Sequence, residues 1–165
     1  MAGCALGVTL ALSGCAASKG SSSVADAAWL PRMESAVART TPAIKVNIQA
    51  SANQAKAGDT IGVRVASNTA GFLYVLHLDG DGRTLRLVFP NAMDDANFVG
   101  AGYVDLPRGN WRLPARGQGG AAHLMAVVSP TQMDLQSLQA QLAYGRFELM
   151  GVYGAAMVQS YPIQD

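Results

Sequence analysis

Residues 71–89, GFLYVLHLDGDGRTLRLVF, predict two antiparallel strands joined by a tight hairpin. The first strand, Phe72–Leu78, is the most apolar segment of its kind in the chain, which is typical of a strand covered on both faces. Asp79–Gly82 contains two Asp-Gly pairs, and such pairs tolerate the positive φ angles that hairpin turns need. The returning strand is Thr84–Phe89, and we expect the apolar strand Phe72–Leu78 to be central in its sheet.

Further strands are predicted on both sides of the hairpin, because apolar residues alternate there with polar ones and turn residues separate the segments. These strands are Ile44–Gln49, Thr60–Ala66, Tyr103–Leu106, Ala122–Val128 and Ala155–Pro162. One helix is expected between the last two, from Asp134 to Tyr144, with Gly145 as its stop. The pattern predicts a mainly β fold, a β-sandwich of immunoglobulin-like or transthyretin-like architecture with this one helix inserted late in the chain.

A short helical segment is predicted ahead of the strands, because apolar residues between Val24 and Arg39 have helical spacing. Pro31 is expected to break it into a turn or two on each side. Trp29 and Leu30 precede this proline, and two interpretations remain open for them. They either dock on the core of the domain or form an exposed element for a partner; docking is favoured because aromatic side chains mostly bury area.

Composition excludes several classes of function. The chain has 12 basic and 11 acidic residues without any basic run, so we expect neither nucleic acid nor an acidic polymer as partner. Half of the residues are hydrophobic, which is enough for a single core. Cys4 and Cys15 are the only cysteines, so once an N-terminal signal is removed no disulfide or thiolate metal site can form.

The N-terminus resembles a bacterial lipoprotein signal peptide. A short apolar run leads into Leu12-Ser13-Gly14-Cys15, which is similar to a lipobox, although Met1–Gly7 has no Lys or Arg. The resemblance implies cleavage before Cys15 and lipidation of that cysteine, while a buried N-terminal helix is the alternative. We therefore expect residues 1–14 to be the signal peptide, 15–23 a flexible tether, 24–43 a helical lead-in and 44–165 the folded domain.

A series of motifs between Ile44 and Ser129 resembles the DUF4384 family. The motifs are, in chain order, residues 57–61 (AGDTI), 71–82 (GFLYVLHLDGDG), 87–91 (LVFPN), 95–102 (DANFVGAG), 106–107 (LP) and 126–129 (AVVS). The resemblance implies a β-sandwich module, often carried by bacterial lipoproteins and sometimes encoded near type VI secretion genes. It implies no catalytic residues.

Candidate chemical sites are few. An EF-hand loop that begins at Asp79 would need a carboxylate where Pro90 stands, so a hairpin turn is preferred to a calcium loop. A looser cation site that joins Asp79 and Asp81 to Asp94 or Asp95 stays open. The remaining candidates are single side chains: His77 and His123, predicted as hydrogen-bonded sheet histidines, and Tyr74, Tyr103 and Trp111, predicted to fill the core rather than to line a groove for a sugar or peptide.

The sequence thus predicts a non-catalytic lipoprotein without cofactor or metal, anchored through Cys15 in the cell envelope. We expect it at the outer membrane, facing the periplasm, because residue 16 is Ala rather than Asp. Its partner is expected to be another protein of an envelope complex, such as a secretion system of type VI. An immunity-type lipoprotein that binds a periplasmic toxin or a small ligand is the alternative. The candidate partner-binding residues lie in loops 90–102 and 108–120 and are Asn91, Asp94, Asp95, Asn97, Arg108, Trp111 and Arg116.

Overall fold

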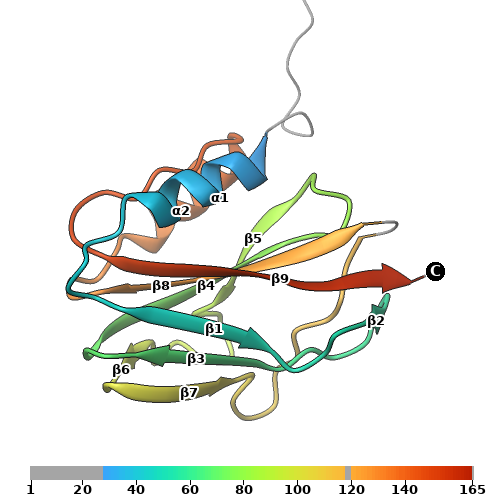
Figure 1. Ribbon diagram of the computed structural model, residues 1–165, viewed down its shortest axis with the longest axis horizontal. Coiled ribbons are helices and arrows are strands. Elements are labelled where there is room, and N and C mark those ends of the chain that lie inside the picture. The colour runs from blue at the N-terminus through green and yellow to red at the C-terminus, as the bar shows by residue number, and fades with distance from the viewer. Residues whose placement is uncertain (1–27, 118–119, 165) are drawn as a thin grey trace, which may run out of the picture.

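The computed structural model describes residues 28–117 and 120–164 (Figure 1). The predicted signal peptide, the tether and the lipidation site Cys15 lie outside the described residues. No helix in the described part of the chain is both long enough and apolar enough to cross a bilayer.

The described residues form two β-sheets packed face to face (Figure 1). The smaller sheet has the order β1 (Val46–Ala50), β3 (Val63–Ser67) and β7 (Gly102–Leu106). The larger sheet has the order β2 (Ala55–Lys56), β9 (Gly154–Gln164), β8 (Ala121–Ser129), β4 (Gly71–Leu78) and β5 (Leu85–Phe89), with β6 (Phe98–Val99) paired to β4. All pairs are antiparallel except β2 with β9. The prediction of a mainly β chain with a β-sandwich is confirmed.

Two helices form a third layer over the outer face of the larger sheet (Figure 1). They are α1 (Trp29–Ala38) and α2 (Leu135–Ala143), the short early helix and the late helix that the sequence predicts. Strand β4 is therefore covered on both faces: Leu73 and Val75 belong to the core between the sheets, whereas Tyr74 and Leu76 belong to the core beneath the helices. This double burial explains why β4 is so apolar in sequence.

Helix α1 corrects the prediction that Pro31 interrupts the N-terminal helical segment. The helix runs without a break from Trp29 to Ala38, and Pro31 lies in its first turn. Backbone N–H groups in a first turn have no acceptor within the helix, so a proline there removes no helical hydrogen bond. The docking interpretation of Trp29 is confirmed, because this side chain is 2% exposed and its Nε1 donates to the carbonyl oxygen of Arg83 at 3.0 Å.

Buried tyrosines tie both helices to the larger sheet. The hydroxyl of Tyr153 donates to the carbonyl oxygen of Ala36 in α1 at 2.9 Å. The hydroxyl of Tyr74 accepts the N–H of Met133, just before α2, at 2.7 Å. Asp134 then caps α2, because its Oδ1 accepts the N–H groups of Gln136 and Ser137. The late helix is thus an integral layer of the fold.

Gly154, the first residue of β9, packs closely against Ile44, which lies just ahead of β1. A Cβ atom there would lie 2.4 Å from the carbonyl oxygen of Ile44. We expect Gly154→Ala to lower the free energy of unfolding by about 2 kcal/mol, because backbone has to move to relieve the overlap. Urea unfolding measures the loss, and Gly100→Ala is the control because nothing lies within 4 Å of its added Cβ. Equal effects of the two substitutions would contradict the close approach.

Candidate functional site

Three side chains join the loop after β5 to the segment after β7, and we call Asp94, Arg108 and Trp111 the loop clamp. Arg108 binds Asp94 with two hydrogen bonds, Nε to Oδ2 at 2.9 Å and Nη2 to Oδ1 at 2.6 Å. Nη2 also donates to the carbonyl oxygen of Ala96 at 2.8 Å, and Trp111 Nε1 donates to Asp94 Oδ2 at 3.2 Å. The clamp thus brings together three of the seven predicted partner-binding residues.

The ring of Phe89 packs against two members of the loop clamp, Trp111 and Arg108. The ring of Trp111 stacks on that of Phe89 with centroids 6.4 Å apart, and the guanidinium of Arg108 lies 5.0 Å from the Phe89 centroid. A cation over an aromatic face is favourable when partly desolvated. The hydrogen bonds from Arg108 hold the pKa of Asp94 below its ordinary value, although partial burial acts in the opposite direction. Pairing with Arg108 therefore favours the ionised form of Asp94.

Of the two predicted asparagines, Asn91 folds the loop onto itself and Asn97 ties the loop to β4. Asn91 Nδ2 donates to the carbonyl oxygen of Val88, and its Oδ1 accepts the N–H groups of Met93 and Asp94. Asn97 is buried and its Nδ2 donates to the carbonyl oxygen of Leu73 at 3.2 Å. The bonds of Asn91 satisfy polar groups within the loop, and the bond of Asn97 fixes the loop to the larger sheet.

Breaking the clamp is expected to loosen this end of the sandwich. Asp94→Ala should lower the free energy of unfolding by about 1.5 kcal/mol, because it removes the carboxylate that accepts hydrogen bonds from Arg108 and Trp111, while solvent partly screens the loss. Chemical denaturation of both proteins measures the difference. The neighbouring carboxylate Asp95 is exposed, so Asp95→Ala is the matched control and should change little. If the two variants lose the same amount, the clamp does not stabilise the loops.

A cleft of about 340 Å³ opens beside the clamp, between strand β5 and the segment 111–116. We call it the arginine cleft, because Arg86, Arg112 and Arg116 line it and no carboxylate does. Its other lining residues are His77, Leu87, Val88, Asn91, Ala92, Met93, Trp111, Leu113 and Pro114. Met93, at its rim, is 68% exposed.

Behind the cleft, Asp79 holds Arg86 in place. Arg86 Nη1 donates to Asp79 Oδ2, and His77 Nδ1 lies 3.5 Å from Asp79 Oδ1. Asp79 is 5% exposed and His77 is fully buried. Burial acts to raise the pKa of Asp79, but the hydrogen bonds from His77 and Arg86 outweigh it, so this pKa lies below its ordinary value. The carboxylate therefore offsets the charge of Arg86 and fixes its orientation.

Arg112 and Arg116 give the cleft its net positive charge. Both side chains are exposed, and neither forms an ion pair with a carboxylate in residues 28–117 and 120–164. Arg116 was among the predicted partner-binding residues, whereas Arg86 and Arg112 were not. Three arginines stand four residues apart at positions 108, 112 and 116, and this spacing is a signal that sequence reasoning could have used. The sequence does not show that Arg112 and Arg116 lie opposite strand β5, because that neighbourhood depends on the tertiary structure.

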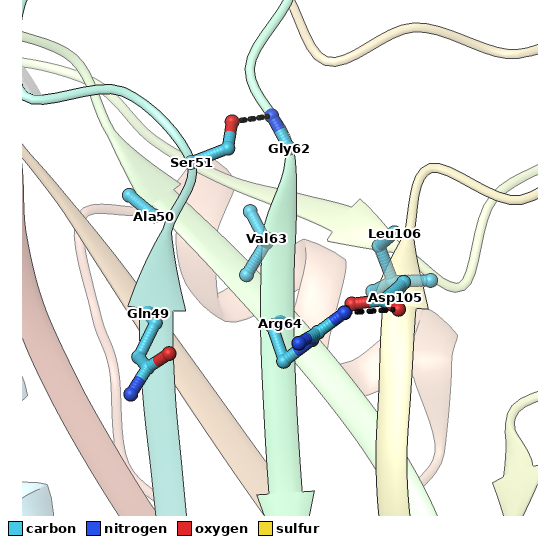
Figure 2. A pocket seen from close by; sticks show the side chains of 8 residues that line it. All are labelled: Gln49, Ala50, Ser51, Gly62, Val63, Arg64, Asp105 and Leu106. Carbon is cyan, nitrogen blue, oxygen red and sulfur yellow. Dashed lines mark hydrogen bonds and ion pairs between the residues drawn. The ribbon is translucent and has the colours of Figure 1, made fainter.

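A second hollow, of about 270 Å³, lies on the outer face of the smaller sheet (Figure 2). Figure 2 shows Arg64 of β3 and Asp105 of β7 directed toward one another, with Gln49 of β1 beside them. Arg64 binds Asp105 through Nε at 2.6 Å and Nη2 at 2.9 Å, so the two charges cancel. This hollow has a neutral pair where the arginine cleft has free charge, which makes the arginine cleft the better candidate site.

Other predicted residues have different surroundings. Tyr74 and Trp111 are buried, as the core-filling prediction requires, but that prediction is wrong for Tyr103, which is 78% exposed on the smaller sheet. Tyr103 stays exposed because it lies on the same outer face of β7 as the exposed Asp105.

Burial lowers the pKa of His123, so the neutral imidazole is favoured. The described residues contain no group of three His, Cys, Asp or Glu that could hold a metal ion, so the open cation site near Asp79 gains no support.

The fold and the cleft together define a small β-sandwich domain with a basic surface cleft. Residues 54–132 match the family described as "Domain of unknown function (DUF4384)", and this chain therefore contains a DUF4384 domain. No curated protein and no solved structure matches the chain significantly. All residues of the arginine cleft lie within the matched region, whereas α1, β1, α2 and β9 lie outside it.

Proposed function

We propose that this protein is a non-catalytic lipoprotein of the cell envelope and that its arginine cleft binds a protein partner there. The cleft carries this proposal, because both loops predicted to bind a partner meet strand β5 at it. Loops held rigid by a scaffold commonly carry binding, and the loop clamp supplies that rigidity.

Lipidation at Cys15 supplies the mechanism in this proposal. An anchor confines the domain to a shell beside the membrane and raises its effective concentration for a partner in the same shell. A secretion apparatus of type VI is the complex that the family resemblance implies. Neither membrane anchoring nor partner binding requires a catalytic group, and the role of the cleft in this proposal is to bind the partner.

In-cell crosslinking followed by pull-down tests the proposal. We compare the natural chain with Cys15→Ser, with Arg112→Gln/Arg116→Gln, and with the control Arg32→Gln/Arg146→Gln, whose arginines are also exposed but do not line the cleft. We expect a discrete set of envelope proteins that both Cys15→Ser and the cleft variant weaken and the control retains.

Two results would overturn the proposal in different ways. Capture of the same proteins by the cleft variant would remove the cleft from the interface. A single soluble partner that Cys15→Ser retains in full would support the inhibitor alternative in place of a tethered assembly.

A further inference from the structure

Strand β5 is an edge strand of the larger sheet and borders the arginine cleft. Its partner on one side is β4, and within residues 28–117 and 120–164 no strand pairs with its other side. Arg86, Leu87 and Val88 of β5 line the cleft, together with His77 of β4. An open edge carries backbone N–H and C=O groups that can pair with a further strand.

The opposite wall of the cleft is an extended segment that does not itself pair with β5. Its backbone is bound to the chain ahead of β3: Ile61 N–H donates to Leu113 at 2.8 Å, and Ala115 N–H donates to Asp59 at 2.8 Å. Gly58 N–H donates to Ala115 at 3.0 Å on the same side. At its far end the carbonyl oxygen of Arg116 accepts the N–H of Gly80, in the turn between β4 and β5, at 3.0 Å. The segment is therefore fixed as a wall of the cleft.

The positive charge of the cleft determines which side chains a bound segment should have. Neither Arg112 nor Arg116 forms an ion pair with a carboxylate of the described residues. Among those residues, the only carboxylate that binds a cleft arginine is Asp79, behind Arg86. Guanidinium groups bind carboxylates with two parallel hydrogen bonds, which combines attraction with defined geometry. Acidic side chains are therefore the groups best suited to pair with Arg112 and Arg116.

We propose that the β5 edge accepts a short, extended acidic segment of the partner protein as an additional strand, with its carboxylates paired to Arg112 and Arg116. This inference rests on the proposed function and names the chemistry of the partner. Main-chain hydrogen bonds to β5 supply affinity in this mode, and the arginines supply specificity. Because β5 has five residues and Pro90 follows its last residue, the added strand is short.

NMR titration of the full chain with Cys15→Ser tests the inference. The probe is a pool of capped seven-residue peptides in which Val or Ile alternates with Asp or Glu, and the matched pool has Lys or Arg at the acidic positions. We expect the acidic pool to shift the amide signals of residues 85–88 and the basic pool to leave them unchanged. Arg112→Gln/Arg116→Gln should weaken binding at least about tenfold, whereas Arg32→Gln/Arg146→Gln should not.

N-methylation of the probe separates strand addition from simple charge attraction. In an antiparallel or parallel pair, only alternate residues of a strand direct their N–H groups to the neighbour. Methylating the amides that point toward β5 should abolish binding, whereas methylating the amides that point away should leave binding unchanged. Equal tolerance of both sets, or no shift at β5 with the acidic pool, would overturn the inference.

The outcome is distinguishable from failure of the proposed function. If envelope proteins are captured through the cleft in cells but the acidic pool does not bind, partner binding stands and strand addition is wrong. If the acidic pool binds at β5 while no envelope protein is captured, the peptide chemistry stands and the envelope role is wrong.

Discussion

Replacing Trp29 by alanine is expected to lower the free energy of unfolding by about 4 kcal/mol, the largest loss we expect from any single substitution. The indole is 2% exposed beneath α1, and the substitution empties its site. It also removes the hydrogen bond that Nε1 donates to the Arg83 carbonyl. Urea unfolding followed by tryptophan fluorescence of the remaining Trp111, and by circular dichroism, measures the loss.

The control for this prediction lies on the same helix. Glu34 is exposed on α1, so Glu34→Ala should change the midpoint of unfolding very little. A loss below about 1.5 kcal/mol for Trp29→Ala would show that α1 unfolds separately from the sheets. Such a result would place the N-terminal boundary of the cooperative unit after α1.

The Trp29 result bears on where the domain begins. The matched family region starts at residue 54, yet α1 contributes Trp29, Met33 and Ala36 to the core on the outer face of the larger sheet. Without α1 and α2, β4 and β8 would expose one apolar face to solvent. In this chain, α1 and α2 therefore stabilise the DUF4384 domain although they lie outside the matched region.

Periodicity predicted the strands well and the helix interruption badly, for identifiable reasons. The β4–β5 hairpin follows from local chemistry: Gly82 has φ +70°, and its N–H donates to the Asp79 carbonyl, as an Asp-Gly turn allows. The break at Pro31 was wrong because the effect of a proline depends on its position in a helix, and the helix start was not visible in the sequence. Trp29 supplies that start by docking on the sheet.

The arginine cleft could be predicted only in part. The loops were found from their turn residues, but Arg86 and Arg112 were missed, because alternation shows which residues share a face and not which strands become neighbours. The clamp between Asp94 and Arg108 spans 14 residues and depends on tertiary structure. The buried Asp79 was assigned to a turn, and its role beside Arg86 appears only when β4 and β5 are paired.

Replacing Asp79 by alanine is expected to lower the free energy of unfolding by about 3 kcal/mol at neutral pH. The carboxylate is 5% exposed, and its removal leaves Arg86 without its anion and the buried His77 without its neighbour. Breaking a buried pair from one side costs about 3–5 kcal/mol, and the partial exposure of Arg86 places the loss at the lower end. The control is Asp105→Ala, which breaks an exposed pair with Arg64 and should leave the unfolding midpoint nearly unchanged.

The same carboxylate makes part of the stability depend on pH. The folded pKa of Asp79 lies below its ordinary value, so the unfolded chain takes up this proton at a higher pH than the folded chain does. The stabilisation is therefore complete above the ordinary aspartate pKa, about 4, and is lost as the pH falls through the lower folded value. The difference between the natural chain and Asp79→Ala, measured by urea unfolding, should hold between pH 7 and about 4.5 and shrink at lower pH. A difference that instead grows on acidification would show that Asp79 is protonated in the folded protein and that Arg86 is oriented by some other group.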